Sequence, residues 1–186
     1  MEHFKPKSRS NLSLLWRDRP PNNCNLTSFA SPNHDFEVFI DNQVLNLSLQ
    51  ASQNAAPHET IGLLAGRVCQ DARGSYTVIL AMEAAKDNEI EATPIDVHIS
   101  SKSYAQLRSR LELNYPVLET VGWFHSHPLS SPILSEEDIV EQSTWTDRNH
   151  VALVVSLTGR TEVFGVFYGP EAFPLFGPLP YPATGA

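Results

Sequence analysis

Two apolar segments joined by a turn signal place the strongest constraint on how this chain can fold. Residues 59–68 form a nearly continuous apolar run that contains two glycines, and residues 76–82 form a second run. Between them, Asp71-Ala-Arg-Gly74 is typical of a hairpin turn. A continuous apolar run of this length indicates a buried strand, so we expect a hairpin in the interior of a sheet.

The rest of the chain alternates between strand-like and helix-like patterns. Helical patterns cover residues 41–54, where Asp41 is the expected N-cap, and residues 101–113 and 135–145. Further strand patterns lie at residues 36–40, 95–99, 117–127, 151–155 and 163–168. The order β-α-β-β-β-α-β-α-β-β predicts an α/β fold in which helices pack against a mixed sheet.

Length, charge and cysteine content exclude several classes of protein. A chain of 186 residues is expected to form one globular domain. Its net charge of −8 argues against a nucleic-acid partner, and its longest apolar runs are too short for a membrane helix. Two cysteines exclude both a disulfide framework and a cysteine-built zinc finger, and a cytoplasmic location is the default expectation.

The two ends of the chain differ from the middle. Residues 1–34 are expected to form a flexible arm: the first 20 residues carry five basic and two acidic groups, and Ser, Asn and Pro are frequent up to residue 34. This arm is either a solvated tail or a segment that docks on an acidic partner. Residues 171–186 form a Pro-rich tail that cannot join a sheet interior, which leaves residues 35–170 as the folded domain.

A pair of histidines and a nearby carboxylate form a candidate metal site. His125 and His127 end a predicted strand, so both imidazoles point to the same face. Asp138 follows in the first turn of a predicted helix, and two histidines with one carboxylate are typical of a catalytic zinc ion. Alternatively, the histidine pair occurs by chance and Ser135-Glu-Glu-Asp138 is only a helix capping box. The two roles of Asp138 compete, because a carboxylate bound to zinc cannot fully serve as a backbone cap.

These residues together match one family motif. The motif is a glutamate before an apolar strand, then His-x-His-Pro, six residues, Ser, two residues and Asp; here it stands as Glu59, His125-Ser-His-Pro128, Ser135 and Asp138. This pattern resembles the JAMM motif of the MPN+ zinc peptidases, the metal-dependent deubiquitinase family. The resemblance covers residues 36–170 and implies a single MPN-type domain with a curved mixed sheet, similar to cytidine deaminases.

The resemblance also implies a role for each motif residue. His125, His127 and Asp138 would hold one Zn²⁺ ion, Glu59 would act as general base, and Ser135 would donate its hydroxyl to the oxyanion. The implied reaction is hydrolysis of the peptide or isopeptide bond after the C-terminus of ubiquitin or a ubiquitin-like modifier. The family places a substrate-facing loop where residues 84–94 lie.

Partners and alternative functions follow from the same resemblance. Stand-alone prokaryotic members resemble components that act with ubiquitin-like proteins and their activating and conjugating enzymes, some of them in antiviral defence. Two other functions remain open within the family. One is a peptidase that trims a sulfur-carrier protein or cuts a small amide, and the other is a non-catalytic MPN scaffold.

Overall fold

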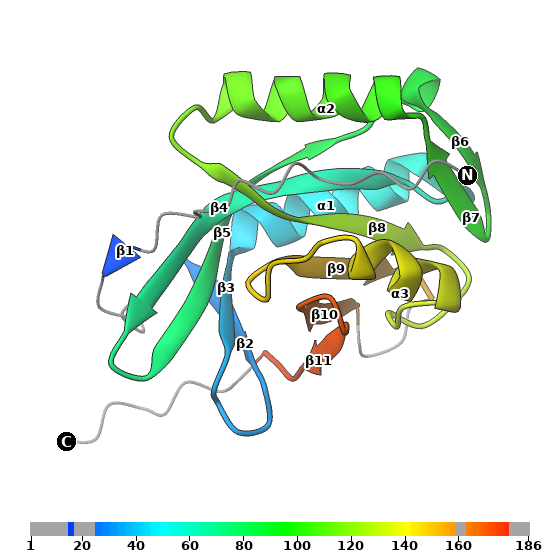
Figure 1. Ribbon diagram of the computed structural model, residues 1–186. Helices are drawn as coiled ribbons and strands as arrows, with labels where there is room; N and C mark the ends of the chain where they lie inside the picture. Colours follow the sequence, from blue (N-terminus) through cyan, green and yellow to red (C-terminus); the bar gives the residue numbers. More distant parts are fainter. Residues whose placement is uncertain (1–14, 17–24, 159–162, 179–186) are drawn as a thin grey trace.

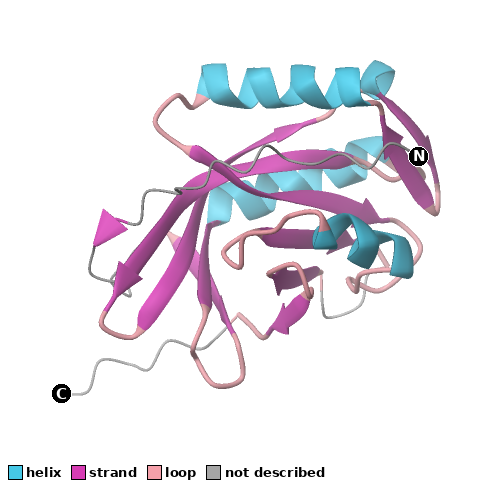
Figure 2. Cartoon of the chain, viewed as in Figure 1, coloured by secondary structure: helices cyan, strands magenta, loops and turns pink. Residues whose placement is uncertain are grey.

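A curved mixed sheet forms the centre of the molecule. A computed structural model describes residues 15–16, 25–158 and 163–178 (Figure 1). The main sheet has nine strands, in the order β11-β10-β9-β8-β4-β5-β3-β2 with β1 paired to β4, and a separate hairpin joins β6 to β7. Helices α1 (Asn42–Ala55) and α2 (Ser101–Asn114) flank the sheet (Figures 1 and 2). The shorter helix α3 (Glu136–Ser143) follows β8 in the chain.

The strands of the main sheet are mostly short, apart from one long central hairpin. Their bounds are β1 (Leu15–Trp16), β2 (Leu26–Ala30), β3 (Glu37–Asp41), β4 (Ile61–Asp71), β5 (Gly74–Ala84), β8 (Glu119–His127), β9 (Val151–Ser156), β10 (Phe164–Tyr168) and β11 (Phe173–Leu175). The separate hairpin comprises β6 (Ile90–Thr93) and β7 (Asp96–Ile99), preceded by the 3₁₀ turn η1 (Asp87–Glu89). β4 pairs antiparallel with β5 and β8, whereas β3–β5 and β8–β9 are parallel pairs. The expected mixed sheet is therefore confirmed.

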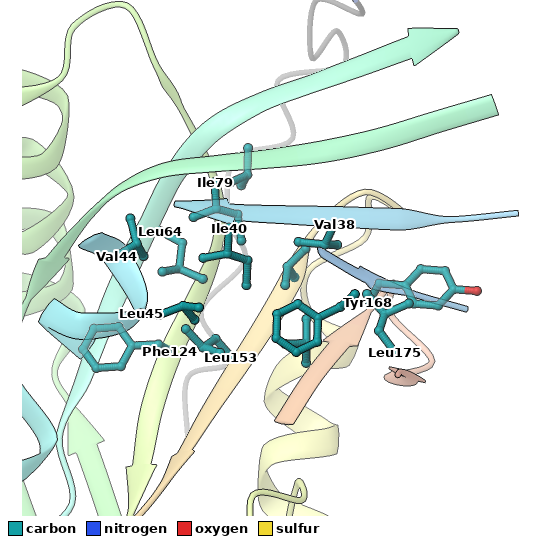
Figure 3. Close-up of a cluster of buried hydrophobic side chains, with 14 of the residues drawn as sticks. Val38, Ile40, Val44, Leu45, Leu64, Ile79, Phe124, Leu153, Tyr168 and Leu175 are labelled. Carbon is teal, nitrogen blue, oxygen red and sulfur yellow. The ribbon is translucent and has the colours of Figure 1, made fainter. Parts of the chain in front are cut away.

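The predicted apolar hairpin is the core of this sheet. β4 and β5 pair from Gly62–Ala84 to Asp71–Gly74. Successive residues of β4 enter different cores: Leu64 joins the cluster that includes α1 (Figure 3), and Leu63 joins the cluster that includes α2. Because strand side chains alternate between faces, the continuous apolar run is buried on both sides.

The two long helices begin where their patterns predict and bury most of the expected apolar side chains, although Leu47 and Leu113 are exposed. The Asp41 carboxylate accepts a hydrogen bond of 2.8 Å from the backbone N–H of Gln43 and caps α1, whose Val44 and Leu45 are buried. In α2, the buried side chains are Tyr104, Leu107 and Leu111. Within the described residues, none of the helices combines the length and apolar character needed to cross a membrane.

Three short strands lie where the residue pattern contains no strand signal. β2 falls within the expected arm and pairs antiparallel with β3, and β11 falls within the expected tail and pairs with β10. Ala30 and Phe176 form a bridge between these two edges, so the sheet curls round on itself and extends beyond the boundaries set at residues 34 and 171. β6 occupies the expected loop at 84–94. The remainder of the arm and tail, residues 1–14, 17–24 and 179–186, lies outside the described residues.

Candidate metal centre

The last residues of β8 carry the histidine pair in the interior of the sheet. His125 and His127 are 1% and 6% exposed, and their Nε2 atoms lie 2.7 Å apart, so the two rings point at a common place. β9 lies directly alongside β8, and a Cβ on Gly122 would clash with the carbonyl oxygen of Val151. The Gly-Trp-Phe sequence before the histidines therefore begins with a residue that the close strand pairing requires.

Helix α3 brings a carboxylate to the same place. The Oδ2 atom of Asp138 lies 3.4 Å from Nε2 of His125 and 3.5 Å from Nε2 of His127. The same Oδ2 accepts a 2.7 Å hydrogen bond from the backbone N–H of Ser135, and the Ser135 hydroxyl accepts one of 3.1 Å from the N–H of Asp138. The capping box and the cluster with the histidines therefore coexist, and they share one carboxylate oxygen.

Glu59 lies immediately before β4, next to this cluster. Its backbone N–H donates to the carbonyl of Thr93 at 2.8 Å, and the following residue, Thr60, is joined to Ser126, which stands between the two histidines. The Glu59 side chain is buried, and burial raises its pKa to about 7; His127 opposes this rise, and Asp138 adds to it. A carboxylate with a pKa near neutrality suits a group that must take up and release a proton.

Hydrogen bonding indicates which nitrogen of His127 faces the other ligands. Its Nδ1 lies 3.0 Å from the carbonyl oxygen of Ser131. A carbonyl only accepts, so Nδ1 carries a hydrogen, and in the neutral ring Nε2 then has the lone pair that a metal ligand needs. The Nδ1 atom of His125 is buried without a partner among the described residues.

The charges of the cluster favour a cation. Burial raises the pKa of Asp138, but hydrogen bonds with His125 and His127 outweigh it, so the net pKa is well below the ordinary value. Burial lowers the pKa of His125. Burial acts in the same direction on His127, but its bonds with Asp138 and Ser131 outweigh it and raise the pKa, so a positive charge is favoured at this place. An ionised carboxylate and a neutral imidazole are the protonation states in which these groups bind metals.

The donor set and spacing fit zinc. The ligand atoms of His125, His127 and Asp138 all lie within 4.8 Å of one another. Ligands about 2.0–2.2 Å from a tetrahedral zinc lie roughly 3.3–3.6 Å apart, which matches both histidine–carboxylate distances. The 2.7 Å contact between the imidazoles is a hydrogen bond, which bound zinc would replace. Three protein ligands leave one position open, as in catalytic zinc sites.

Sequence reasoning assigned five motif residues to one site. The structure places them before β4, at the end of β8 and at the start of α3. Sequence reasoning missed the Ser131 carbonyl, which has no sequence signal because every residue carries one. It also missed Gln142, a fully buried side chain four residues after Asp138. Helical spacing was a usable signal for Gln142, because residues four apart share a helix face.

Comparison with known proteins shows the family to which the chain belongs. The model of a family described as prokaryotic homologs of the JAB domain matches residues 41–167, which include the histidine pair, Asp138 and Glu59. The chain belongs to this family. It is also 29% identical over 124 residues to a Lys-63-specific deubiquitinase, BRCC36, from Camponotus floridanus. That match covers 65% of this chain and 48% of the relative, so the chain spans about half the length of that protein.

Two solved structures are also similar to this JAB-family chain. The solution structure of protein DSY2949 from Desulfitobacterium hafniense superposes with a TM-score of 0.51 at 23% identity, over 69% of this chain and 82% of that one. The crystal structure of AF2198, a JAB1/MPN domain protein from Archaeoglobus fulgidus, gives 0.41 at 17% identity, over 73% and 92%. The first of these likenesses supports the fold.

Proposed function

We propose that this chain is a zinc-dependent isopeptidase that hydrolyses the bond after the C-terminus of ubiquitin or a ubiquitin-like modifier. The observation that carries this proposal is the convergence of His125, His127 and Asp138 beside the buried carboxylate of Glu59. Family membership and the similarity to a deubiquitinase support the substrate class. Activating and conjugating enzymes of the same modifier pathway are the expected partners.

Each residue of the site has a distinct task in this reaction. Zinc, held by His125, His127 and Asp138, would supply the Lewis acidity that makes water nucleophilic at neutral pH. Glu59 takes a proton from the attacking water and then delivers it to the departing lysine amine. Ser135 uses its hydroxyl oxygen to accept from the N–H of Asp138, which leaves its proton free to donate to the developing oxyanion.

The proposal is tested with the full chain loaded with zinc. Isopeptide-linked diubiquitin and linear fusions of ubiquitin, or of a ubiquitin-like protein encoded near the gene, are incubated with wild type and with Glu59→Gln. Wild type is expected to release the modifier with its C-terminus intact. Glu59→Gln is expected to keep its zinc and to be slower by roughly 10²–10⁴-fold, the usual contribution of general-base catalysis.

Two outcomes would contradict the proposal at different points. If wild-type protein with a full zinc complement cleaves none of these substrates, the isopeptidase activity is rejected in favour of a scaffold or another amide substrate. If Glu59→Gln retains both zinc and normal turnover, the role of Glu59 is wrong although the activity stands.

A further inference from the structure

Helix α3 carries Asp138, yet few of its own side chains are buried. The helix has eight residues, all of them described, and Gln142 is its one buried residue. Its two large apolar side chains, Ile139 and Val140, are 44% and 54% exposed. The capping box with Ser135 sets the local conformation of Asp138, but it is internal to this segment. Leu134 and Trp145, which flank the helix, join the apolar cluster that contains Trp123 of β8. Within the helix itself, the connection to β8 is polar.

Gln142 makes that connection through two buried hydrogen bonds. Its Oε1 accepts a 2.7 Å bond from the indole Nε1–H of Trp123, and its Nε2 donates at 2.9 Å to the carbonyl of Gly169. An indole N–H can only donate and a carbonyl can only accept, so the amide has a single orientation that satisfies both. Both bonds are fully shielded from water, because Gln142 is 0% exposed.

Trp123 in turn contacts the histidine pair. It lies two residues before His125 on the same face of β8, and its ring stacks on the His125 imidazole with centroids 5.0 Å apart and 15° between the planes. Gln142 lies one helical turn after Asp138. A continuous path therefore runs from the carboxylate through α3, Gln142 and Trp123 to the imidazole of His125.

We propose that Gln142 is a positioning residue for the metal centre. It fixes α3 against β8, so that Asp138 and the two histidines meet at one point. This inference rests on the metal centre of the proposed function, but not on its substrate. Outer residues that orient metal ligands typically contribute about 10–100-fold to metal affinity, and this is the size of effect expected from Gln142.

The substitution Gln142→Met tests the proposal by metal binding in the full chain. Methionine has a similar length but no hydrogen-bonding amide, so it leaves the buried Trp123 N–H unpaired. It also removes one of the two hydrogen bonds to the Gly169 carbonyl, which still accepts from the N–H of Ala172 at 3.1 Å. Zinc affinity is measured by chelator competition, and the visible absorption of the Co²⁺-loaded protein reports the ligand geometry. Gln142→Met is expected to bind zinc about 10–100-fold more weakly and to show an altered Co²⁺ spectrum.

A matched control is available on another helix. Gln106 of α2 is exposed, and Gln106→Met is expected to leave zinc affinity and the Co²⁺ spectrum unchanged. If Gln142→Met does not fold, Gln142→Glu gives the same readout. It keeps an acceptor for Trp123 but, when ionised, has no proton to donate to Gly169.

The outcomes separate this inference from the proposed function. If Gln142→Met melts at a lower temperature but keeps the wild-type zinc affinity and Co²⁺ spectrum, Gln142 is only a structural residue and the inference is overturned. If wild type itself binds neither Zn²⁺ nor Co²⁺, the metal centre fails and both proposals fall. Weaker binding in Gln142→Met alone, with an altered spectrum, supports the inference even if no substrate is cleaved.

Discussion

The carboxylate of Asp138 shows how one side chain serves both a helix and a metal centre. Its Oδ2 atom lies within 2.7–3.5 Å of the Ser135 N–H and of both imidazoles. A negative charge in the first turn of a helix is itself favourable, because it faces the positive end of the helix dipole. The Ser-x-x-Asp spacing of the motif therefore places the cap and the ligand in a single turn.

Ser126, which stands between the two histidines, links β8 to the segment that carries Glu59. It points away from the imidazoles, is fully buried, and accepts a 2.9 Å hydrogen bond from the N–H of Thr60, while its own N–H donates to the Thr60 carbonyl at 3.0 Å. The residue after Glu59 is thereby tied to the residue between the two histidines. The Ser126 hydroxyl thus takes the place of a backbone carbonyl as the acceptor for the Thr60 N–H, just before β4 begins.

Ser126→Ala is expected to destabilise the protein by about 1–3 kcal/mol, because the buried Thr60 N–H loses its acceptor. Urea unfolding of the metal-free protein measures this change. The exposed Ser109 of α2, whose hydroxyl donates to the carbonyl of Ala105, provides the control, and Ser109→Ala is expected to change stability by less than about 0.5 kcal/mol. Equal losses in the two variants would show that the Thr60 contact contributes nothing.

At the scale of elements, several contacts attach the β6–β7 hairpin and the turn η1 before it to the rest of the fold. Arg110 of α2 bonds both oxygens of Glu89 in η1, and it also bonds the Glu83 carboxylate at 3.1 Å and the carbonyl of Ala84 at 3.2 Å in β5. In the hairpin itself, Ile90 and Ile99 pack against the cluster that includes α2, and the Thr93 carbonyl accepts from the N–H of Glu59. The hairpin is thus connected directly to the backbone of the proposed general base.

Arg110→Ala is expected to loosen this hairpin. Amide hydrogen exchange across residues 87–99, followed by mass spectrometry, should quicken by roughly tenfold, which corresponds to about 1.4 kcal/mol in the opening equilibrium. Arg108→Ala is the matched control, because Arg108 pairs with Glu112 on the same helix surface. If amide exchange in residues 87–99 is the same in Arg110→Ala as in wild type, the hairpin is held by its other contacts.

Sequence patterns predicted the helices and strands whose own apolar residues are buried. They failed for the strands that form only by pairing with a neighbouring strand. The β4–β5 hairpin and α2 carry their own signals. β6 (Ile-Glu-Ala-Thr) and β11 (Phe-Pro-Leu) are too short and mixed to show one, and they become strands only through pairing. The site divides in the same way: the motif identified the ligands, whereas the Gln142 contacts exist only once α3 lies against β8.

At the scale of the molecule, the candidate metal centre joins parts that the sheet alone does not hold together. Its histidines come from β8, inside the main sheet, and its carboxylate comes from α3 on the periphery. A metal bound between them cross-links these parts in the folded state only. Metal binding and global stability are therefore expected to be coupled.

Removal of zinc by a chelator should lower the melting temperature. At a free zinc concentration of about 100 times Kd, binding contributes about 2.7 kcal/mol to the free energy of unfolding. Differential scanning calorimetry with and without chelator measures the shift. His125→Ala, which lacks a ligand, is expected to melt at the same temperature under both conditions. A chelator effect of equal size in wild type and variant would place the stabilising metal elsewhere.

His150, which is not one of the proposed metal ligands, should contribute to the loss of stability at acid pH. Burial lowers its pKa below 6.5, against the opposing charge of Asp147, and its Nδ1 has no partner among the described residues. Its ring packs edge-on against Trp145, with centroids 5.1 Å apart. Because the pKa is lower in the folded than in the unfolded state, the unfolded state binds more protons below about pH 6.5.

The neutral imidazole of His150 thus contributes stability that is fully present above about pH 6.5 and is lost as pH falls through the folded-state pKa. The free energy of unfolding of metal-free protein should fall by up to about 1.4 kcal/mol per pH unit from this group. His150→Phe keeps an aromatic ring beside Trp145 and cannot titrate, so its acid limb should be shallower. Parallel acid limbs in wild type and His150→Phe would assign the loss of stability to other groups.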